Sequence, residues 1–203
     1  MPVEALSPPI DSVEGDAPSP TRPVSSEFRH TRLSTLISRE RLQARVKELG
    51  VQIAQDYSDR QLVLICIMKG SFIFAADLAR AIDLPLHIEF LGVQSYLTGT
   101  SSTGVVQITQ DLTHPIAGED ILIVEDIVDS GLTVEYIREL LSTRKPRSIK
   151  LCSLLHKPAR QRRAVEIDYV GFEIDDVFVV GYGLDHAQRF RNLPEIAILD
   201  PAE

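Results

Sequence analysis

Acidic, hydroxyl and glycine residues gather directly after a short apolar run in the middle of the chain. The run is residues 121–124, and the residues that follow it are Glu125, Asp126, Asp129, Ser130, Gly131 and Thr133. An apolar strand that leads through small residues into a helix presents unsatisfied N–H groups and the positive end of the helix dipole to an anion. Gly131 permits close backbone approach, and Ser130 and Thr133 add hydroxyl donors. The segment therefore predicts a phosphate-binding loop.

The carboxylates in this segment need partners other than phosphate. Glu125 and Asp126 are adjacent, so together they can accept hydrogen bonds from the two hydroxyls of a vicinal diol. Asp129 stands apart from this pair, and we expect it to have a different target. The alternative interpretation is a cluster of acids that only caps the N-terminus of the following helix.

The same segment resembles a known family signature. An apolar strand followed by E-D-x-x-D-[ST]-G-x-T is similar to the phosphoribosyl pyrophosphate signature of type I phosphoribosyltransferases. Four further segments resemble the bacterial, hypoxanthine-using members of that family, in the same order and at fitting spacings: Met68-Lys69-Gly70, Ser95-Tyr96, Lys157-Pro158 and residues 178–194. The resemblance extends over residues 33–200, and several separate motifs carry it.

This resemblance implies an enzyme that transfers the 5-phosphoribosyl group from phosphoribosyl pyrophosphate to N9 of hypoxanthine, and of guanine, with release of pyrophosphate. Asp129 would be the general acid/base at purine N7. Mg²⁺ is the implied cofactor, held by Asp185, with Glu125 as a second contact near the ribose. The residues implied at the ribose and 5′-phosphate are Glu125, Asp126, Ser130, Gly131 and Thr133.

The other matched residues are implied to bind pyrophosphate, close the site or bind the purine. Lys69, Gly70 and Arg191 would contact pyrophosphate, in a loop that often has a non-proline cis peptide bond in this family. Ser95 and Tyr96 would belong to a lid. Lys157 would donate to O6 of the purine, Phe178 would stack on its ring, and the backbone of Val179 would meet its edge.

Three of these residues also have a plain structural interpretation. Lys69 alone would be a surface lysine that follows a strand. Phe178 alone would be a core aromatic. Lys157 alone would be an exposed cation in the basic stretch 144–163.

A regulatory protein on the same scaffold is the competing functional class, because some such proteins bind nucleic acid and use the phosphoribosyl pocket as a sensor. The formal net charge of -8 opposes binding to a phosphate backbone or an anionic membrane. No apolar run approaches the ~20 residues of a membrane span. We therefore expect a purine base and phosphoribosyl pyrophosphate as ligands, no nucleic acid and no membrane, and the family resemblance suggests a homodimer or homotetramer.

Apolar periodicity predicts the elements that position these residues. Continuous apolar runs predict strands at 62–68, 86–93, 121–124, 149–155, 169–172, 177–180 and 196–199. Helical spacing predicts helices over 72–82 and 133–141, and a first helix capped by Ser38, with helical periodicity beginning near Leu33. Residues 94–110 have few large apolar side chains and predict a flexible active-site lid loop. The sum is an α/β fold with a mainly parallel twisted sheet flanked by helices, and a small hood.

The chain length of 203 residues suits a single domain. Residues 1–30 hold half of the prolines, interleaved with serines and acids, and predict a disordered tail ahead of a phosphoribosyltransferase domain at 31–203. Cys66 and Cys152 lie inside apolar runs, which predicts buried thiols and a reducing, cytoplasmic location.

Overall fold

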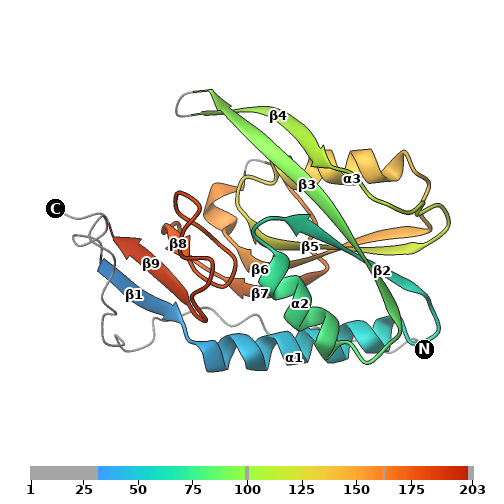
Figure 1. Ribbon diagram of the computed structural model, residues 1–203, viewed down its shortest axis with the longest axis horizontal. Helices are drawn as coiled ribbons and strands as arrows, with labels where there is room; N and C mark the ends of the chain where they lie inside the picture. Colours follow the sequence, from blue (N-terminus) through green and yellow to red (C-terminus); the bar gives the residue numbers. More distant parts are fainter. Residues whose placement is uncertain (1–31, 99–100, 162, 201–203) are drawn as a thin grey trace.

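Two β-sheets and three α-helices make up the described part of the chain, which in this computed structural model comprises residues 32–98, 101–161 and 163–200 (Figure 1). Side chains are described for all of these residues except 95–106 and 200. The expected tail of residues 1–30 lies outside the described residues. The fold class predicted from the sequence is confirmed.

The larger sheet has six strands in the order β4-β3-β2-β5-β6-β7. Its strands are β2 (Leu62–Met68), β3 (Leu86–Thr98), β4 (Ser101–Gln110), β5 (Asp120–Val128), β6 (Ser148–His156) and β7 (Tyr169–Glu173). All neighbouring strands are parallel except β3 and β4. Parallel strands joined by helices end at one edge of the sheet, so the loops that follow them share that edge.

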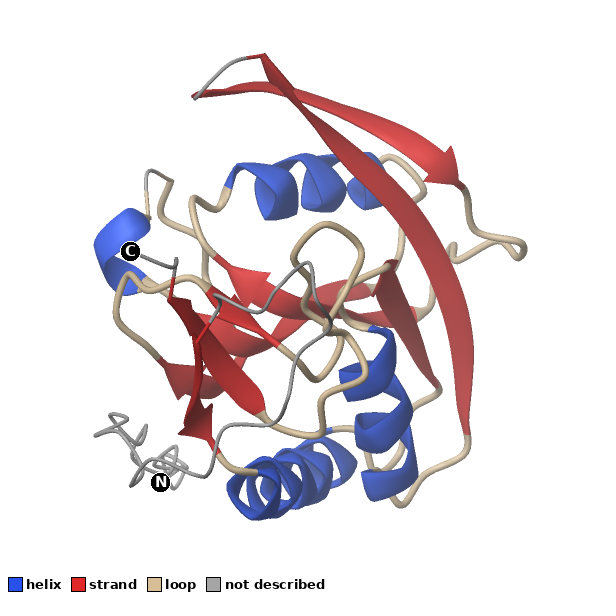
Figure 2. Cartoon of the chain, turned by 60° about the vertical axis from the view of Figure 1, so that its left-hand side comes forward, coloured by secondary structure: helices blue, strands red, loops and turns tan. Residues whose placement is uncertain are grey.

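Helices cover both faces of this sheet. Helices α1 (Arg39–Asp56) and α2 (Phe72–Ala81) pack on one face, and α3 (Leu132–Ser142) packs on the other (Figure 2). Successive side chains of a strand point to opposite faces, so alternate residues of β2 belong to different cores. Leu64 and Cys66 join the core under α1 and α2, whereas Ile65 joins the core under α3. This double coverage explains why the strand is apolar at every position.

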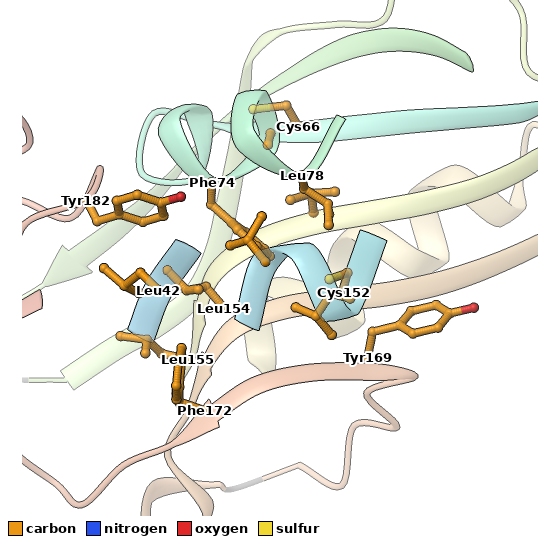
Figure 3. Packing of buried hydrophobic residues seen from close by; sticks show 14 of the residues in the cluster. Leu42, Cys66, Phe74, Leu78, Cys152, Leu154, Leu155, Tyr169, Phe172 and Tyr182 are labelled. Atoms are coloured by element: carbon orange, nitrogen blue, oxygen red, sulfur yellow. The ribbon is translucent and has the colours of Figure 1, made fainter. Parts of the chain in front are cut away.

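The core under α1 and α2 is seen in Figure 3. Leu42 of α1 and Phe74 of α2 pack toward side chains of the sheet such as Cys152 and Leu154 of β6. Cys66 and Cys152 are fully buried free thiols, as expected. No helix among the described residues combines the length and apolar character needed to cross a membrane.

The first helix begins where its cap predicts. Ser38 is the N-cap, and its side chain accepts a hydrogen bond from the backbone N–H of Arg41 at 3.4 Å. The residues before the cap form a strand, β1 (Arg32–Ile37), so the helical periodicity expected from Leu33 onward is wrong. Strand β1 pairs with β9 (Ile196–Asp200), at the other end of the sequence. Local periodicity cannot reveal a partner so distant in sequence.

Strands β1 and β9 belong to a second, antiparallel sheet in the order β1-β9-β8, which is the expected hood. Strand β8 is only Val179–Val180, shorter than the run 177–180 predicted. Val179 pairs with Ile198, and Leu199 N–H donates to the carbonyl of Phe178 at 3.0 Å. The C-terminal strand therefore holds the backbone on which Phe178 and Val179 lie.

The segment expected as a flexible loop, residues 94–110, is instead part of two long antiparallel strands. Strand β3 continues to Thr98 and β4 returns from Ser101, forming an arm that projects from the sheet (Figures 1 and 2). Backbone hydrogen bonds between neighbouring strands do not require apolar side chains. The segment therefore forms a hairpin although its sequence lacks the apolar pattern that predicts strands.

Candidate active site

The predicted site residues follow the carboxyl ends of four parallel strands. Lys69 and Gly70 follow β2, and Asp129 follows β5. Lys157 follows β6, and the loop that leads to Phe178 follows β7. Because these strands are neighbours in the order β2-β5-β6-β7, residues spread over more than a hundred positions of the sequence share one edge of the sheet.

The loop between β5 and α3 has the geometry of an anion site. Gly131 is the N-cap of α3 with a φ of 82°, and no side chain among the described residues caps the helix. The first intrahelical bond runs from Glu135 N–H to the carbonyl of Gly131, at 3.0 Å, so the earlier N–H groups lack helical partners. The acids of the segment do not cap α3, so the capping interpretation is wrong.

Glu125 and Asp126 lie inside β5, although the sequence predicted that the strand ends at residue 124. Pairing of β5 with β2 stops at Val124, whereas pairing with β6 continues to Val128. The two acids therefore lie beyond the last residue of β5 that pairs with β2, at the end of the sheet where the site lies. The apolar run predicts a strand that is too short, because the polar residues Glu125 and Asp126 interrupt it.

Both acids have raised pKa values, and burial is the largest cause for each. Glu125 is buried, and its Oε2 atom meets no hydrogen-bond donor among the described residues. Burial, and then the charge of Asp126, raise the pKa of Glu125 well above its usual range. Burial likewise raises the pKa of Asp126 to about 6, against hydrogen bonds that lower it, including one from Ile127 N–H. An acceptor left unpaired in this way is suited to a ligand hydroxyl or a cation.

Asp129 lies in the loop between β5 and α3, where it faces the turn that follows β6. Its Oδ1 atom is buried and lies 3.1 Å from Nε of Arg160, an ion pair without the alignment of a hydrogen bond. The side chain as a whole is 42% exposed, so its remaining atoms stay accessible to a ligand.

Lys157 is buried, with 7% of its side chain exposed, so its interpretation as an exposed cation is wrong. Its Nζ donates to the carbonyl of Val177 at 2.7 Å. Phe178, the next residue, is 53% exposed and packs edge-on with His186, so it is not a core aromatic. The buried ammonium thus contacts the backbone next to the exposed aromatic residue, at the carboxyl edge of the sheet.

Two loops carry the residues that the family resemblance implied for pyrophosphate. Lys69 is exposed, and the peptide bond between Met68 and Lys69 is cis, as the family resemblance implied. Nη1 of Arg191 donates to the carbonyl of Gly183 at 2.7 Å, and its Nη2 lies 2.6 Å from Oδ1 of Asp185. A cleft of about 490 Å³ opens between these loops and the base of the β3–β4 arm, lined by Met68, Lys69, Gly92, Val93, Gln188 and Arg191, among others.

Two of the predicted site residues lie apart from this cluster, and two residues that belong to it were not predicted from the sequence. Ser95 and Tyr96 lie on the arm, where Ser95 pairs with Val106, and their side chains fall outside the described part. Arg160 and Asp176 were not predicted, yet they contact Asp129 and Lys157. Arg160 was one of several cations in a basic stretch, and only the fold shows which cation faces the site.

A mostly parallel sheet with an anion-binding loop and paired acids at its carboxyl edge defines the class of α/β proteins that bind phosphorylated ligands there. The phosphoribosyl transferase domain family matches residues 35–187, which is most of the chain. The chain therefore belongs to the phosphoribosyltransferase family.

Similar proteins narrow this assignment. The hypoxanthine-guanine phosphoribosyltransferase of Mycobacterium avium is 51% identical over 174 residues, which cover 83% of this chain and 86% of that protein. Its counterpart in Bacillus subtilis is 48% identical over 175 residues, 86% of this chain and 97% of that protein. A crystal structure of a hypoxanthine phosphoribosyltransferase from Staphylococcus aureus matches with a TM-score of 0.80 at 47% identity, covering 83% of this chain and 91% of that chain. The chain is thus an enzyme of purine salvage that transfers a phosphoribosyl group.

Proposed function

We propose that this enzyme transfers the 5-phosphoribosyl group from phosphoribosyl pyrophosphate to N9 of hypoxanthine and guanine. The observation that carries the choice of a 6-oxopurine is the buried ammonium of Lys157, which donates to the carbonyl of Val177, the residue before the exposed Phe178. An ammonium has only donors, so it suits the O6 acceptor of hypoxanthine or guanine. The amino group of adenine would leave it without an acceptor.

The purine stacks on Phe178, and the backbone of Val179 meets its edge. A base stacked on an aromatic ring is typically stabilised by ~1–3 kcal/mol. Leu199 N–H fixes the carbonyl of Phe178, and Val179 is paired in the hood, so neither residue depends on the ligand for its position. The side chain of Phe178 is therefore presented to the site in advance of binding.

Asp129 acts as the general acid/base at purine N7. As N9 forms its bond to ribose C1, the electron density of the imidazole ring shifts, and a proton on N7 can pass to a carboxylate within hydrogen-bond reach. The accessible part of the Asp129 carboxylate, at the edge between the phosphate loop and Lys157, supports this role. Arg160 holds its other oxygen.

Ribose and its 5′-phosphate bind at the loop between β5 and α3. Glu125 and Asp126 accept hydrogen bonds from the two ribose hydroxyls, which would satisfy the unpaired Oε2 of Glu125. The 5′-phosphate accepts from the uncapped N–H groups of α3 beside Gly131 and from the hydroxyls of Ser130 and Thr133.

Pyrophosphate binds in the cleft beside Lys69, Gly70 and Arg191, where the planar guanidinium suits paired phosphate oxygens. The carboxylates of Asp185 and Glu125 fit Mg²⁺, because Mg²⁺ prefers oxygen ligands and keeps several waters, so it needs few protein ligands. When bound, Mg²⁺ supplies a Lewis acid that stabilises the charge on the leaving pyrophosphate.

The arm that carries Ser95 and Tyr96 closes over the reacting centre. Closure excludes water, which would otherwise attack the electrophilic ribose carbon, and strengthens electrostatic contacts inside. The cleft reaches the base of this arm at Gly92 and Val93, which supports the assignment.

The enzyme works as a cytoplasmic homodimer or homotetramer. Its two buried thiols suit a reducing compartment. Ile88 and Phe90 are 45% and 42% exposed on one face of β3, and a second subunit would cover such apolar side chains. Light scattering on the purified protein measures the oligomeric state.

A nucleic-acid-binding regulator, the competing class, has no support among the relatives described above, which are named as enzymes. The test of the proposed function is an assay of purified protein with phosphoribosyl pyrophosphate, Mg²⁺ and each of hypoxanthine, guanine, xanthine, adenine and uracil. We expect turnover of hypoxanthine and guanine. Turnover confined to adenine or uracil would contradict the proposal.

A further inference from the structure

Two cations on the purine side of the site share one carboxylate. Nη1 of Arg160 donates to Oδ1 of Asp176 at 3.1 Å, and Nζ of Lys157 lies 3.8 Å from the same oxygen. Lys157 immediately precedes the 3₁₀ turn Pro158–Arg160, and side chains three residues apart are eclipsed in such a turn. Both cations therefore extend from one side of the turn toward Asp176.

Each cation also reaches the region where the purine is proposed to bind. Nε of Arg160 lies 3.1 Å from Oδ1 of Asp129, and Nζ of Lys157 donates to the carbonyl that precedes Phe178. O6 and N7 lie on the same edge of a 6-oxopurine. The donor for O6 and the acid/base for N7 therefore have to be held at a fixed separation. Among the described residues, Asp176 is the one carboxylate that contacts both cations.

We propose that Asp176 is a positioning residue for this purine edge, an inference that rests on the proposed roles of Lys157 and Asp129. Its carboxylate orients the ammonium of Lys157 directly. Through Arg160 it also orients Asp129, whose Oδ1 is buried against the guanidinium while the rest of the side chain stays accessible. An acid/base oriented by a second group, which is itself held by a third, is a recurring arrangement in catalytic sites.

The network is suited to positioning and not to stabilising the fold. The side chains of Arg160 and Asp176 are 49% and 52% exposed, and ion pairs exposed to this degree contribute little to folding. A small displacement of a reacting group, in contrast, can lower a rate by up to about 100-fold. Loss of the Asp176 charge should therefore change kinetics without changing the melting temperature.

The test compares Asp176→Asn, which keeps the size of the side chain but removes its charge, with the full-length wild type. We expect kcat/KM for hypoxanthine to fall by roughly 10- to 100-fold, through both KM and kcat. KM for phosphoribosyl pyrophosphate should stay close to wild type, because the ribose and pyrophosphate residues are untouched. Asp176→Glu, which restores the charge, should recover part of the loss.

Asp175→Asn is the matched control, because Asp175 is an exposed neighbour that forms no ion pair with the described residues. It should behave as wild type. In the Lys157→Met/Arg160→Gln background, Asp176→Asn should have no further effect, since non-additivity measures coupling between residues. A persistent effect in that background would overturn the inference, because it would show that Asp176 acts by another route.

The outcome separates this inference from the proposed function. Normal kinetics for Asp176→Asn beside an impaired Lys157→Met would overturn the inference and leave the proposed function intact. Normal hypoxanthine kinetics for both Lys157→Met and Asp129→Asn would remove the proposed purine contacts, and the inference would fall with them. A fall in melting temperature that accounts for the lost activity of Asp176→Asn would assign it a structural role.

Discussion

The carboxylate of Asp126 occupies the space in which a side chain on Gly70 would lie, so a Cβ built on Gly70 would overlap Oδ2 of Asp126. The carbonyl oxygen of Gly70 in turn fills the space that a Cβ on Gly183 would need. The end of β5, the loop after β2 and the loop that carries Asp185 and Arg191 are therefore in direct contact. This contact places Asp126, which is proposed to bind ribose, against the two loops that are proposed to bind pyrophosphate.

Gly70→Ala should impair catalysis more than it impairs folding. The added methyl group has to displace the Asp126 carboxylate or the loop, and a displacement of about 1 Å at a reacting centre can lower a rate by ~10²-fold. We expect kcat/KM for phosphoribosyl pyrophosphate to fall by that order. Gly118→Ala is the control, because open space surrounds Gly118, although an alanine at its positive φ costs roughly 1–2 kcal/mol of stability. Equal kinetics for the two variants would contradict the close packing at Gly70.

Asp129→Asn should lower kcat strongly while preserving the fold. An amide cannot take the purine N7 proton, and removing a positioned acid/base typically costs ~10²–10⁴-fold in rate. Single-turnover kinetics with hypoxanthine would measure the chemical step apart from product release. Asp83→Asn makes the same chemical change at an exposed residue between α2 and β3 and should leave kcat unchanged. Nearly full single-turnover rates for Asp129→Asn would show that another group moves the proton.

Glu89→Gln should destabilise the protein at neutral pH and leave activity intact. Burial alone would raise the pKa of Glu89, but hydrogen bonds from Thr113 N–H, His114 and the Thr113 hydroxyl lower it below its usual value of 4.5. A hydrogen bond to a charged group contributes about 1.5–3 kcal/mol to stability. We therefore expect Glu89→Gln to lose free energy of unfolding of that order near pH 7.

The pH dependence of this loss has a defined sign. A carboxylate with a lowered pKa in the folded state stabilises it above the unfolded pKa, and that contribution is lost as the pH falls through the folded pKa. We therefore expect urea unfolding to show a difference in the free energy of unfolding between wild type and Glu89→Gln. This difference should be largest near pH 7 and should disappear below about pH 4. A difference in the free energy of unfolding that is independent of pH would mean that the charge of Glu89 does not stabilise the fold.

Deletion of residues 1–30 should leave activity near wild type, because β1 begins at Arg32 and the family match begins at residue 35. Deletion of residues 1–37 removes β1 as well. Strand β9 then loses one of its two partners, and β9 holds the carbonyl of Phe178 through Leu199. The longer deletion should raise the KM for hypoxanthine and lower the melting temperature. Loss of turnover in a folded 1–30 deletion would give the tail a role in catalysis.

Much of the fold was readable from the sequence because local signals agreed with the tertiary structure. The run 62–68 is apolar at every position because both faces of β2 are covered, and the strand has those bounds. Ser38 caps α1 where its sequence position indicates. The chemistry of the loop after β5 was readable for the same reason, since a strand, a glycine turn and a helix form a local unit.

What stayed hidden depends on contacts between segments distant in the sequence. Strand β1 is stabilised by β9, and the arm by pairing between two polar strands, so neither has a strong pattern of its own. The packing of Gly70 on Asp126 joins two strand ends. Asp176 looked like any other exposed acid, because its two cations come from the turn after β6.

The most direct test of 6-oxopurine recognition is kcat/KM for hypoxanthine and for adenine in wild type and in Lys157→Met, with the exposed Lys47→Met as control. A site built around a hydrogen bond can discriminate by ~10⁴–10⁵, so wild type and Lys47→Met should strongly prefer hypoxanthine. Lys157→Met should lose most of its kcat/KM for hypoxanthine while keeping its affinity for phosphoribosyl pyrophosphate. An unchanged kcat/KM for hypoxanthine in Lys157→Met, or efficient use of adenine by the wild type, would contradict the role given to this lysine.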